Sequence, residues 1–183
     1  MQIAMNANTT RLLAILVAIL GASALRLIPH PPNFTPIGAM ALFSGAYLGR
    51  RGVLAFAAPL GAMLLSDAVI GFHSGMPFVY GSIAAIVVIG WLALQSKSPI
   101  RVVGAALVSS VLFFLVTNLG TWAVSGMYPL TASGLAACYV AAIPFFQNTV
   151  VGDLVYCGLL FGGFALLEQA IPALRPKGKE QPA

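Results

Sequence analysis

The chain has 183 residues, of which 60% are hydrophobic and 7% are charged, and its mean hydropathy is +0.96. So few charges cannot cover the surface of a soluble protein of this size, which excludes a water-soluble globular domain and predicts an integral membrane protein. The net charge of +5 comes from basic residues scattered singly or in pairs, which excludes the basic stripe of a nucleic-acid-binding surface.

The hydrophobic runs predict an all-α bundle, a single membrane domain over residues 1–183 with six transmembrane helices. The first span has the layout of a secretory signal, but the downstream segments are themselves apolar, which favours an uncleaved first span. The second span is short for a hydrocarbon core of about 30 Å, so we expect it to be tilted or shielded by its neighbours. The predicted spans are residues 11–28, 34–48, 52–71, 76–94, 101–124 and 148–171.

Residues 125–147, between the last two spans, contain Pro129 and Pro144. We predict a long connection here, with a short helix over residues 135–143 that lies at the membrane interface.

Small side chains recur every fourth residue in the first span, at Ala14, Ala18 and Ala22. This spacing places them on one helix face, where another helix can approach closely. The approaching helix is either a partner protein's or another helix of this chain.

The basic residues are distributed very unevenly between the two sides that six spans would create. Eight of the nine lie on the side of the termini, and only Arg26 lies on the other side. The positive-inside rule then predicts a multi-pass membrane protein with both termini in the cytoplasm. The eight are Arg11, Arg50, Arg51, Lys97, Arg101, Arg175, Lys177 and Lys179.

Residues 26–38 form the most polar and most rigid stretch between two spans. The segment contains Pro29, Pro31, Pro32 and Pro36, which fix the backbone and prevent the first helix from continuing. We therefore predict a stiff turn that is suited to form the wall of a pocket.

Most side chains able to form hydrogen bonds fall at the predicted outer ends of the spans, and the inner half has few of them. This asymmetry predicts a site for a solute that arrives from outside. The candidate substrate-binding residues are Arg26, His30, Asn33, Asp67, His73, Tyr80, Asn118, Trp122, Gln147, Asn148, Asp153 and Tyr156.

Asp67 and Asp153 are the acids that fall near the predicted outer ends of spans, where a carboxylate must be paired, hydrated or protonated. Arg26 is the predicted outer cation. Two readings of it stay open and are compatible: it bridges an aspartate and holds spans 1, 3 and 6 together, or it contacts the solute.

The start of the last predicted span carries Asn148, Gly152, Asp153 and Tyr156 at spacings of one to four residues. These positions share a broad helix face, which favours the lining of a polar cavity. The alternative is that Asn148 and Thr149 only cap the helix.

Asn118 and Trp122 are one helical turn apart, so an amide and an indole face the same direction near the outer surface. A single tryptophan at this depth is also typical of the aromatic belt at a membrane interface.

Nothing in the sequence indicates a metal site, a cofactor or a catalytic centre. His30 and His73 read as turn residues, and Cys138 and Cys157 lack the spacing of a zinc site and read as packing residues. The chain contains neither a G-x-S-x-G nor an HExxH motif. We therefore predict a protein that is not an enzyme.

Several short motifs resemble a group of uncharacterised bacterial six-span proteins described as transport proteins. They are the run Pro29–Gly38, Ser66-Asp67, Gly71-Phe72-His73, Thr117-Asn118-Leu119-Gly120 and Gly152-Asp153-Leu154. The chain is similar more remotely to the S components of energy-coupling-factor (ECF) vitamin transporters. These resemblances imply a six-helix bundle in the bacterial cytoplasmic membrane that holds a vitamin under its outer loops. The similarity to S components also implies that Ala14, Ala18 and Ala22 dock on a transmembrane coupling subunit, which works with ATPases.

The sequence therefore predicts a membrane-embedded, S-component-like subunit that binds a small solute for uptake, with the solute and the lipid bilayer as partners and no nucleic acid. One alternative is a proton- or ion-coupled secondary carrier or small channel in which Asp67 and Asp153 titrate. A carrier needs polar groups near the midplane, which the inner half lacks. The other alternative is a non-catalytic membrane scaffold.

Overall fold

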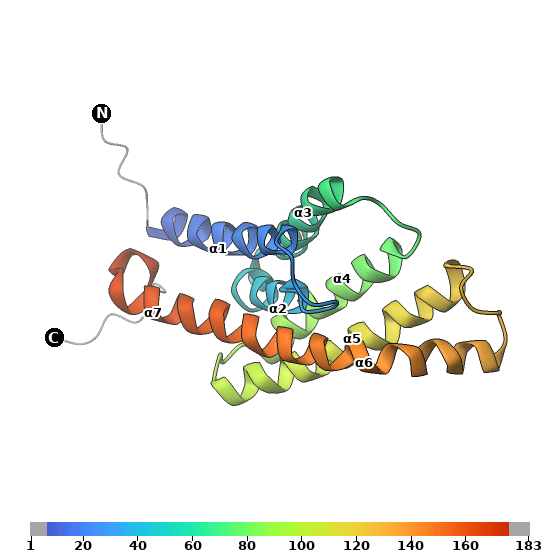
Figure 1. Ribbon diagram of the computed structural model, residues 1–183. Coiled ribbons are helices and arrows are strands. Elements are labelled where there is room, and N and C mark those ends of the chain that lie inside the picture. Colours follow the sequence, from blue (N-terminus) through green and yellow to red (C-terminus); the bar gives the residue numbers. More distant parts are fainter. Residues whose placement is uncertain (1–6, 176–183) are drawn as a thin grey trace.

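The computed structural model describes residues 7–175, which form helices joined by short turns, with no β-strand among them. This confirms the predicted all-α class (Figure 1). The helices are α1 (Ala7–Ala24), η1 (Leu25–Leu27), α2 (Ile37–Leu48), η2 (Gly49–Arg51), α3 (Val53–Ile70), α4 (Met76–Ala93), α5 (Pro99–Val124), α6 (Ala132–Cys157), η3 (Gly158–Gly162), α7 (Gly163–Ala170) and η4 (Pro172–Leu174).

Five helical stretches in the described chain are long and apolar enough to cross a bilayer, which confirms a polytopic membrane bundle. The predicted bounds of the first, third, fourth and fifth spans agree with the structure to within a few residues. The five stretches are residues 8–27, 53–70, 76–93, 99–124 and 132–170.

The second predicted span is present as the 12-residue helix α2, which is not one of the five. At a rise of 1.5 Å per residue, α2 is about 18 Å long, well short of the ~30 Å hydrocarbon core. Ten of its residues are buried, and its ribbon lies between α1 and α6 in Figure 1. The expectation of a short, shielded segment is confirmed, because the other helices surround α2 and remove it from lipid.

The prediction of a long connection over residues 125–147 is wrong. A single helix runs from Ala132 to Ala170 through α6, the π-helical turn η3 and α7. It begins where the Thr131 hydroxyl accepts a hydrogen bond from the Gly134 amide at 3.1 Å. Pro144 lies inside α6 without ending it, because an apolar environment penalises every backbone group that a broken helix would leave unpaired.

Two glycines bring α2 and α4 into backbone contact at the centre of the bundle. A Cβ atom added to Gly45 of α2 would lie 2.1 Å from the Val87 carbonyl oxygen of α4. A Cβ atom added to Gly90 of α4 would lie 2.4 Å from the Leu42 carbonyl oxygen of α2. The two helices therefore approach more closely than any larger residue at these positions permits.

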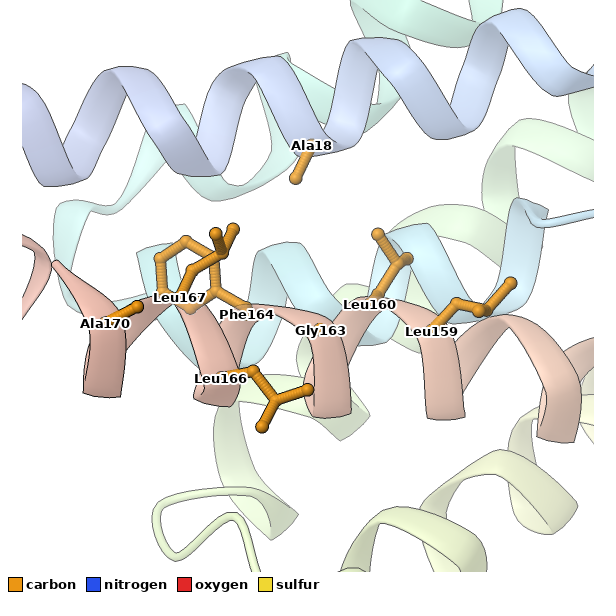
Figure 2. A pocket seen from close by; sticks show the side chains of 8 residues that line it. All are labelled: Ala18, Leu159, Leu160, Gly163, Phe164, Leu166, Leu167 and Ala170. Carbon is orange, nitrogen blue, oxygen red and sulfur yellow. The ribbon is translucent and has the colours of Figure 1, made fainter.

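The alanine face of α1 is used for packing inside the chain, which is one of the two readings that its spacing left open. Ala22 is buried, and Ala14 and Ala18 are half-buried against the core. Ala18 also faces a groove between α1 and the η3–α7 segment (Figure 2). The opposite face of α1 exposes Leu13 and Val17.

Candidate functional site

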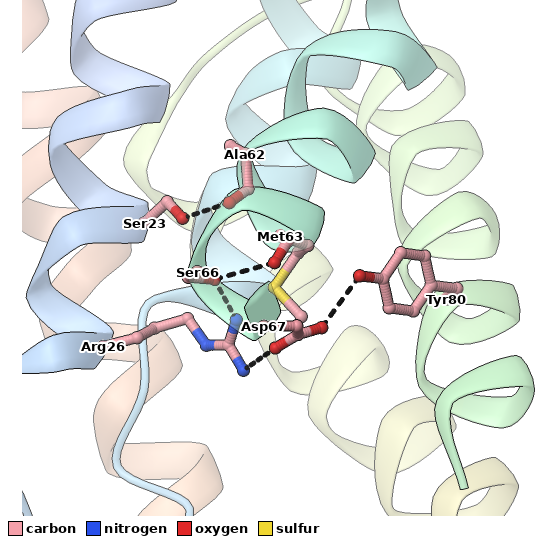
Figure 3. Close-up of polar contacts among 7 residues, drawn as sticks. All are labelled: Ser23, Arg26, Ala62, Met63, Ser66, Asp67 and Tyr80. Atoms are coloured by element: carbon pink, nitrogen blue, oxygen red, sulfur yellow. Dashed lines mark hydrogen bonds and ion pairs between the residues drawn. The ribbon is translucent and has the colours of Figure 1, made fainter. Parts of the chain in front are cut away.

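A buried ion pair joins η1, α3 and α4 (Figure 3). The Arg26 guanidinium nitrogen Nη2 lies 2.8 Å from Asp67 Oδ1, and the Tyr80 hydroxyl donates to Asp67 Oδ2 at 2.8 Å. Arg26 also donates to the Ser66 hydroxyl. Asp67 is only 3% exposed, so its charge depends on these partners for compensation.

Two serines extend this network along α3 (Figure 3). The Ser66 hydroxyl donates to the Met63 carbonyl at 2.9 Å, and the Ser23 hydroxyl of α1 donates to the Ala62 carbonyl at 2.7 Å. The structure therefore supports the reading in which Arg26 bridges an aspartate. The helices that it connects are η1 and α3, with α4 added through Tyr80, and the last predicted span does not take part in this ion pair.

Asp153 has a different set of partners at the start of α2. Ser110 of α5 donates to Asp153 Oδ2 at 2.6 Å, and the backbone amide of Ala39 also hydrogen bonds to this carboxylate. A Cβ atom added to Gly38 would lie 2.3 Å from Asp153 Oδ1. Pro36 precedes α2 and offers no side-chain cap. Asp153 therefore supplies, from another helix, a hydrogen-bond acceptor for the free amides of a helix N-terminus.

The proline-rich segment crosses the face of α6 that the sequence analysis singled out. The Asn148 side-chain amide donates to the Pro32 carbonyl at 3.0 Å, and the Phe34 and Tyr156 rings have centroids 5.5 Å apart. A Cβ atom added to Gly152 would lie 3.3 Å from the Phe34 Cα atom. The predicted shared face therefore exists, and the segment covers it. Capping by Asn148 is excluded, because α6 begins at Ala132.

Other predicted site residues make local contacts and do not join either acid. The Asn118 side-chain amide donates to the Phe114 carbonyl at 2.8 Å, and the Trp122 indole donates to the Pro129 carbonyl at 3.0 Å. His30 is exposed, with Nδ1 at 3.0 Å from the Pro31 carbonyl oxygen. The solvent-exposed candidates among the twelve also include Asn33, His73 and Gln147.

The cysteines and histidines form no metal site in the part of the chain that the structure describes, where no three potential ligands come together. Cys138 and Cys157 are both buried and free, in keeping with their interpretation as packing residues.

The sequence did not reveal two polar groupings that the structure shows. Ser110 was not a candidate, because a serine in an apolar helix gives no signal of its partner. The basic residues were counted only as markers of orientation, yet Arg11, Arg50, Arg51 and Lys97 line one polar pocket. Three separate segments meet there, and the order of residues alone does not reveal such a meeting.

The acids and the basic pocket lie at different depths. Arg11 pairs with Glu168, and Arg26 and Asp153 each lie fifteen residues from these partners along their own helices. At 1.5 Å per residue both separations are about 22 Å. The structure therefore has a basic end and, about 22 Å away, a layer that holds the Arg26–Asp67 pair and Asp153.

Adjacent serines on α5 offer a direct test of the bond to Asp153. Ser110→Ala is expected to destabilise the protein by about 2 kcal/mol, because it leaves a buried carboxyl oxygen of Asp153 without a hydrogen-bond donor. Ser109 is also buried, but its hydroxyl has no partner in residues 7–175. Ser109→Ala should therefore be neutral or slightly stabilising. Thermal unfolding in one detergent compares the two variants, and equal losses would show that the Ser110 bond contributes nothing specific.

Comparison with known proteins gives a family match. A family described as "Family of unknown function (DUF6580)" matches residues 6–174. No curated protein and no solved structure matches the chain.

Proposed function

We propose that this chain, which belongs to the family of unknown function DUF6580, is a non-catalytic, membrane-embedded subunit that binds a small polar solute for uptake. The proposed site is on the face of α6 that carries Asn148 and Tyr156, beneath the proline-rich segment. The protein would act by holding and releasing the solute, with energy supplied by a partner. The resemblance to ECF S components suggests a coupling subunit with ATPases as that partner.

The observation that carries this proposal is the way the proline-rich segment is held. Residues 28–33 are exposed, and the segment contacts α6 through the Asn148–Pro32 hydrogen bond and the Phe34–Tyr156 ring pair. Each contact contributes about 1 kcal/mol. A solute with a hydrogen-bond acceptor and a flat ring offers Asn148 and Tyr156 the same two interactions. Such a solute can take the place of the segment at little cost.

The proline content keeps the conformational entropy change of this exchange small. Pro29, Pro31, Pro32 and Pro36 restrict the segment in every state, so its release from α6 brings little additional disorder. A stiff segment held by two modest contacts therefore moves as a unit, and it can close again over a bound solute. Small heterocyclic compounds, a chemical class that includes many vitamins, match this pair of contacts.

The proposed orientation places this site outside and both termini in the cytoplasm. Arg11 of α1, Arg50 and Arg51 of η2 and Lys97 of the α4–α5 turn gather at the opposite end of the bundle, where the positive-inside rule predicts the cytoplasm. A coupling subunit would then meet the exposed face of α1 at Leu13, Val17 and Leu20, because the alanine face is turned inward.

Solute binding by variants of α6 tests this function. Native mass spectrometry of the protein purified from its host identifies the retained small molecule, which then serves as the ligand. Asn148→Ala and Tyr156→Leu are each expected to weaken its binding about fivefold, the equivalent of one lost contact of ~1 kcal/mol. Val151→Ala is the control, because Val151 is exposed on the same helix and is not among the candidate residues.

Unchanged binding in both site variants would contradict the proposal. So would transport by the purified protein alone in liposomes, which would favour a secondary carrier. Asp153→Asn is a poor first test, because its carboxylate caps α2 and its loss changes stability as well as binding.

A further inference from the structure

A second polar site lies at the basic end of the bundle and is independent of the proposed solute site. A pocket of about 340 Å³ there is lined by Arg11 of α1, Arg50 and Arg51 of η2 and Lys97 of the α4–α5 turn, with Gln95 beside them. Four basic side chains from three segments therefore face one depression.

The acids of the described chain do not neutralise Arg50 and Arg51. Asp67 pairs with Arg26, Asp153 is buried at the start of α2, and Glu168 pairs with Arg11. Neither Arg50 nor Arg51, both exposed, has an ion-pair partner in residues 7–175. Like charges held close together favour an anion between them, because mutual repulsion of the arginines raises its affinity.

Tyr47 fixes the position of two of these cations. The Lys97 ammonium lies 4.7 Å and the Arg11 guanidinium 5.7 Å from the centroid of the Tyr47 ring. Cation–π contacts of this kind restrain long basic side chains that would otherwise move freely at the surface. The pocket therefore has a preorganised side at Tyr47 and a freely accessible side at Arg50 and Arg51.

An apolar groove of about 510 Å³ begins next to this pocket (Figure 2). It runs between Ala18 of α1 and the apolar side chains of η3 and α7, including Leu160, Phe164 and Leu167. The Phe164 ring of the groove and the Tyr47 ring of the pocket have centroids 4.9 Å apart. The Arg11 guanidinium lies 6.0 Å from the Phe164 centroid, so a single aromatic pair separates the groove from the charged pocket.

We propose that this end of the bundle binds an anionic phospholipid, with the headgroup phosphate in the basic pocket and an acyl chain in the adjacent groove. Charge complementarity selects a phosphate-bearing anion, and Arg offers phosphate a bidentate partner. The apolar groove selects a lipid over a free anion, because a soluble phosphate has nothing to place there. Basic pockets between transmembrane helices on the cytoplasmic side are a known setting for anionic headgroups.

The headgroup arm of the test uses the purified protein in phosphatidylcholine nanodiscs that contain phosphatidylglycerol. Native mass spectrometry reports the phosphatidylglycerol retained by the protein. Arg50→Gln/Arg51→Gln is expected to weaken its retention about 25-fold, since each basic side chain near an anionic surface contributes roughly a fivefold factor. Arg101→Gln is the matched control, because Arg101 is exposed on α5 and does not line the pocket.

The acyl-chain arm compares two neighbouring glycines. Gly163 lines the groove and Gly162 does not, and a Cβ atom at either meets no heavy atom within 4 Å. Gly163→Leu is expected to weaken phosphatidylglycerol binding about tenfold by occupying the volume of the chain's methylenes, while Gly162→Leu leaves it unchanged.

The outcomes separate the lipid from other occupants. Loss of phosphatidylglycerol in Arg50→Gln/Arg51→Gln and in Gly163→Leu, with both controls unchanged, supports the proposal. Equal retention of phosphatidylglycerol and phosphatidylcholine by the unmodified protein overturns it. Tight binding of inorganic phosphate, with no effect of Gly163→Leu on phosphatidylglycerol, also overturns it in favour of a soluble anion.

Discussion

Replacement of Gly45 by alanine is expected to destabilise the bundle by at least about 3 kcal/mol, at the upper end of the cost of overpacking. The new methyl group would lie 2.1 Å from the Val87 carbonyl oxygen and 2.8 Å from the Trp91 amide nitrogen. Both are backbone atoms of α4, so no change of side-chain rotamer relieves the clash. The helices α2 and α4 would have to separate, and α2 is too short to remain in the membrane without that contact.

Gly61→Ala and Gly81→Ala are the controls, because both glycines are helical and a Cβ atom at either meets no heavy atom within 4 Å. They should be neutral or stabilising by up to about 1 kcal/mol, since alanine is the better helix former. Thermal unfolding in detergent, followed by circular dichroism, measures all three variants. A melting temperature of Gly45→Ala equal to that of Gly61→Ala would show that α2 and α4 are not in backbone contact.

The sequence was sufficient for the helices that end at polar or basic turns. Long apolar runs bounded by residues such as Arg50-Arg51 or Lys97 indicate helices, because a bilayer tolerates only helices and closed barrels and the strands of a barrel alternate apolar with polar residues. Helical periodicity also predicted that Asn148 and Tyr156 share a face of one helix, since the helical repeat fixes which side chains point in the same direction.

The sequence was insufficient where tertiary contacts decide the local structure. Pro144 normally signals the end of a helix, but in this apolar setting α6 continues through it. The partners of Asp67 and Asp153 were undetermined, because helices that are apolar all round contain no periodic signal for the direction in which each face points. The basic pocket was missed for a related reason: its four cations belong to three segments that are separate in the sequence, which are α1, η2 and the α4–α5 turn.

The second large effect concerns the Arg26–Asp67 ion pair. Arg26→Met is expected to destabilise the protein by about 3–5 kcal/mol, because it leaves a buried carboxylate without its counter-ion. The side chains of Arg26 and Asp67 are only 12% and 4% exposed. The double variant Arg26→Met/Asp67→Leu should recover most of that loss, since an apolar pair often replaces a buried ion pair at little cost.

Chemical unfolding of Arg26→Met, Asp67→Leu and the double variant yields the coupling energy of this pair. Arg11→Met is the matched control, because the Arg11–Glu168 pair is more accessible, with both side chains 21% exposed. A comparatively exposed pair contributes about 1 kcal/mol or less. Equal losses of unfolding free energy in Arg11→Met and Arg26→Met would show that the Arg26–Asp67 pair is hydrated and does not stabilise the packing of η1 on α3.

The double variant also separates the two readings of Arg26 that the sequence left open. If Arg26 serves only to hold η1 on α3, the refolded double variant binds the solute as tightly as the unmodified protein. If Arg26 also contacts the solute, the double variant is folded but binds at least about tenfold more weakly, because a charge-assisted hydrogen bond is lost. Stability and binding therefore respond differently in this one variant, and the difference assigns Arg26 its role.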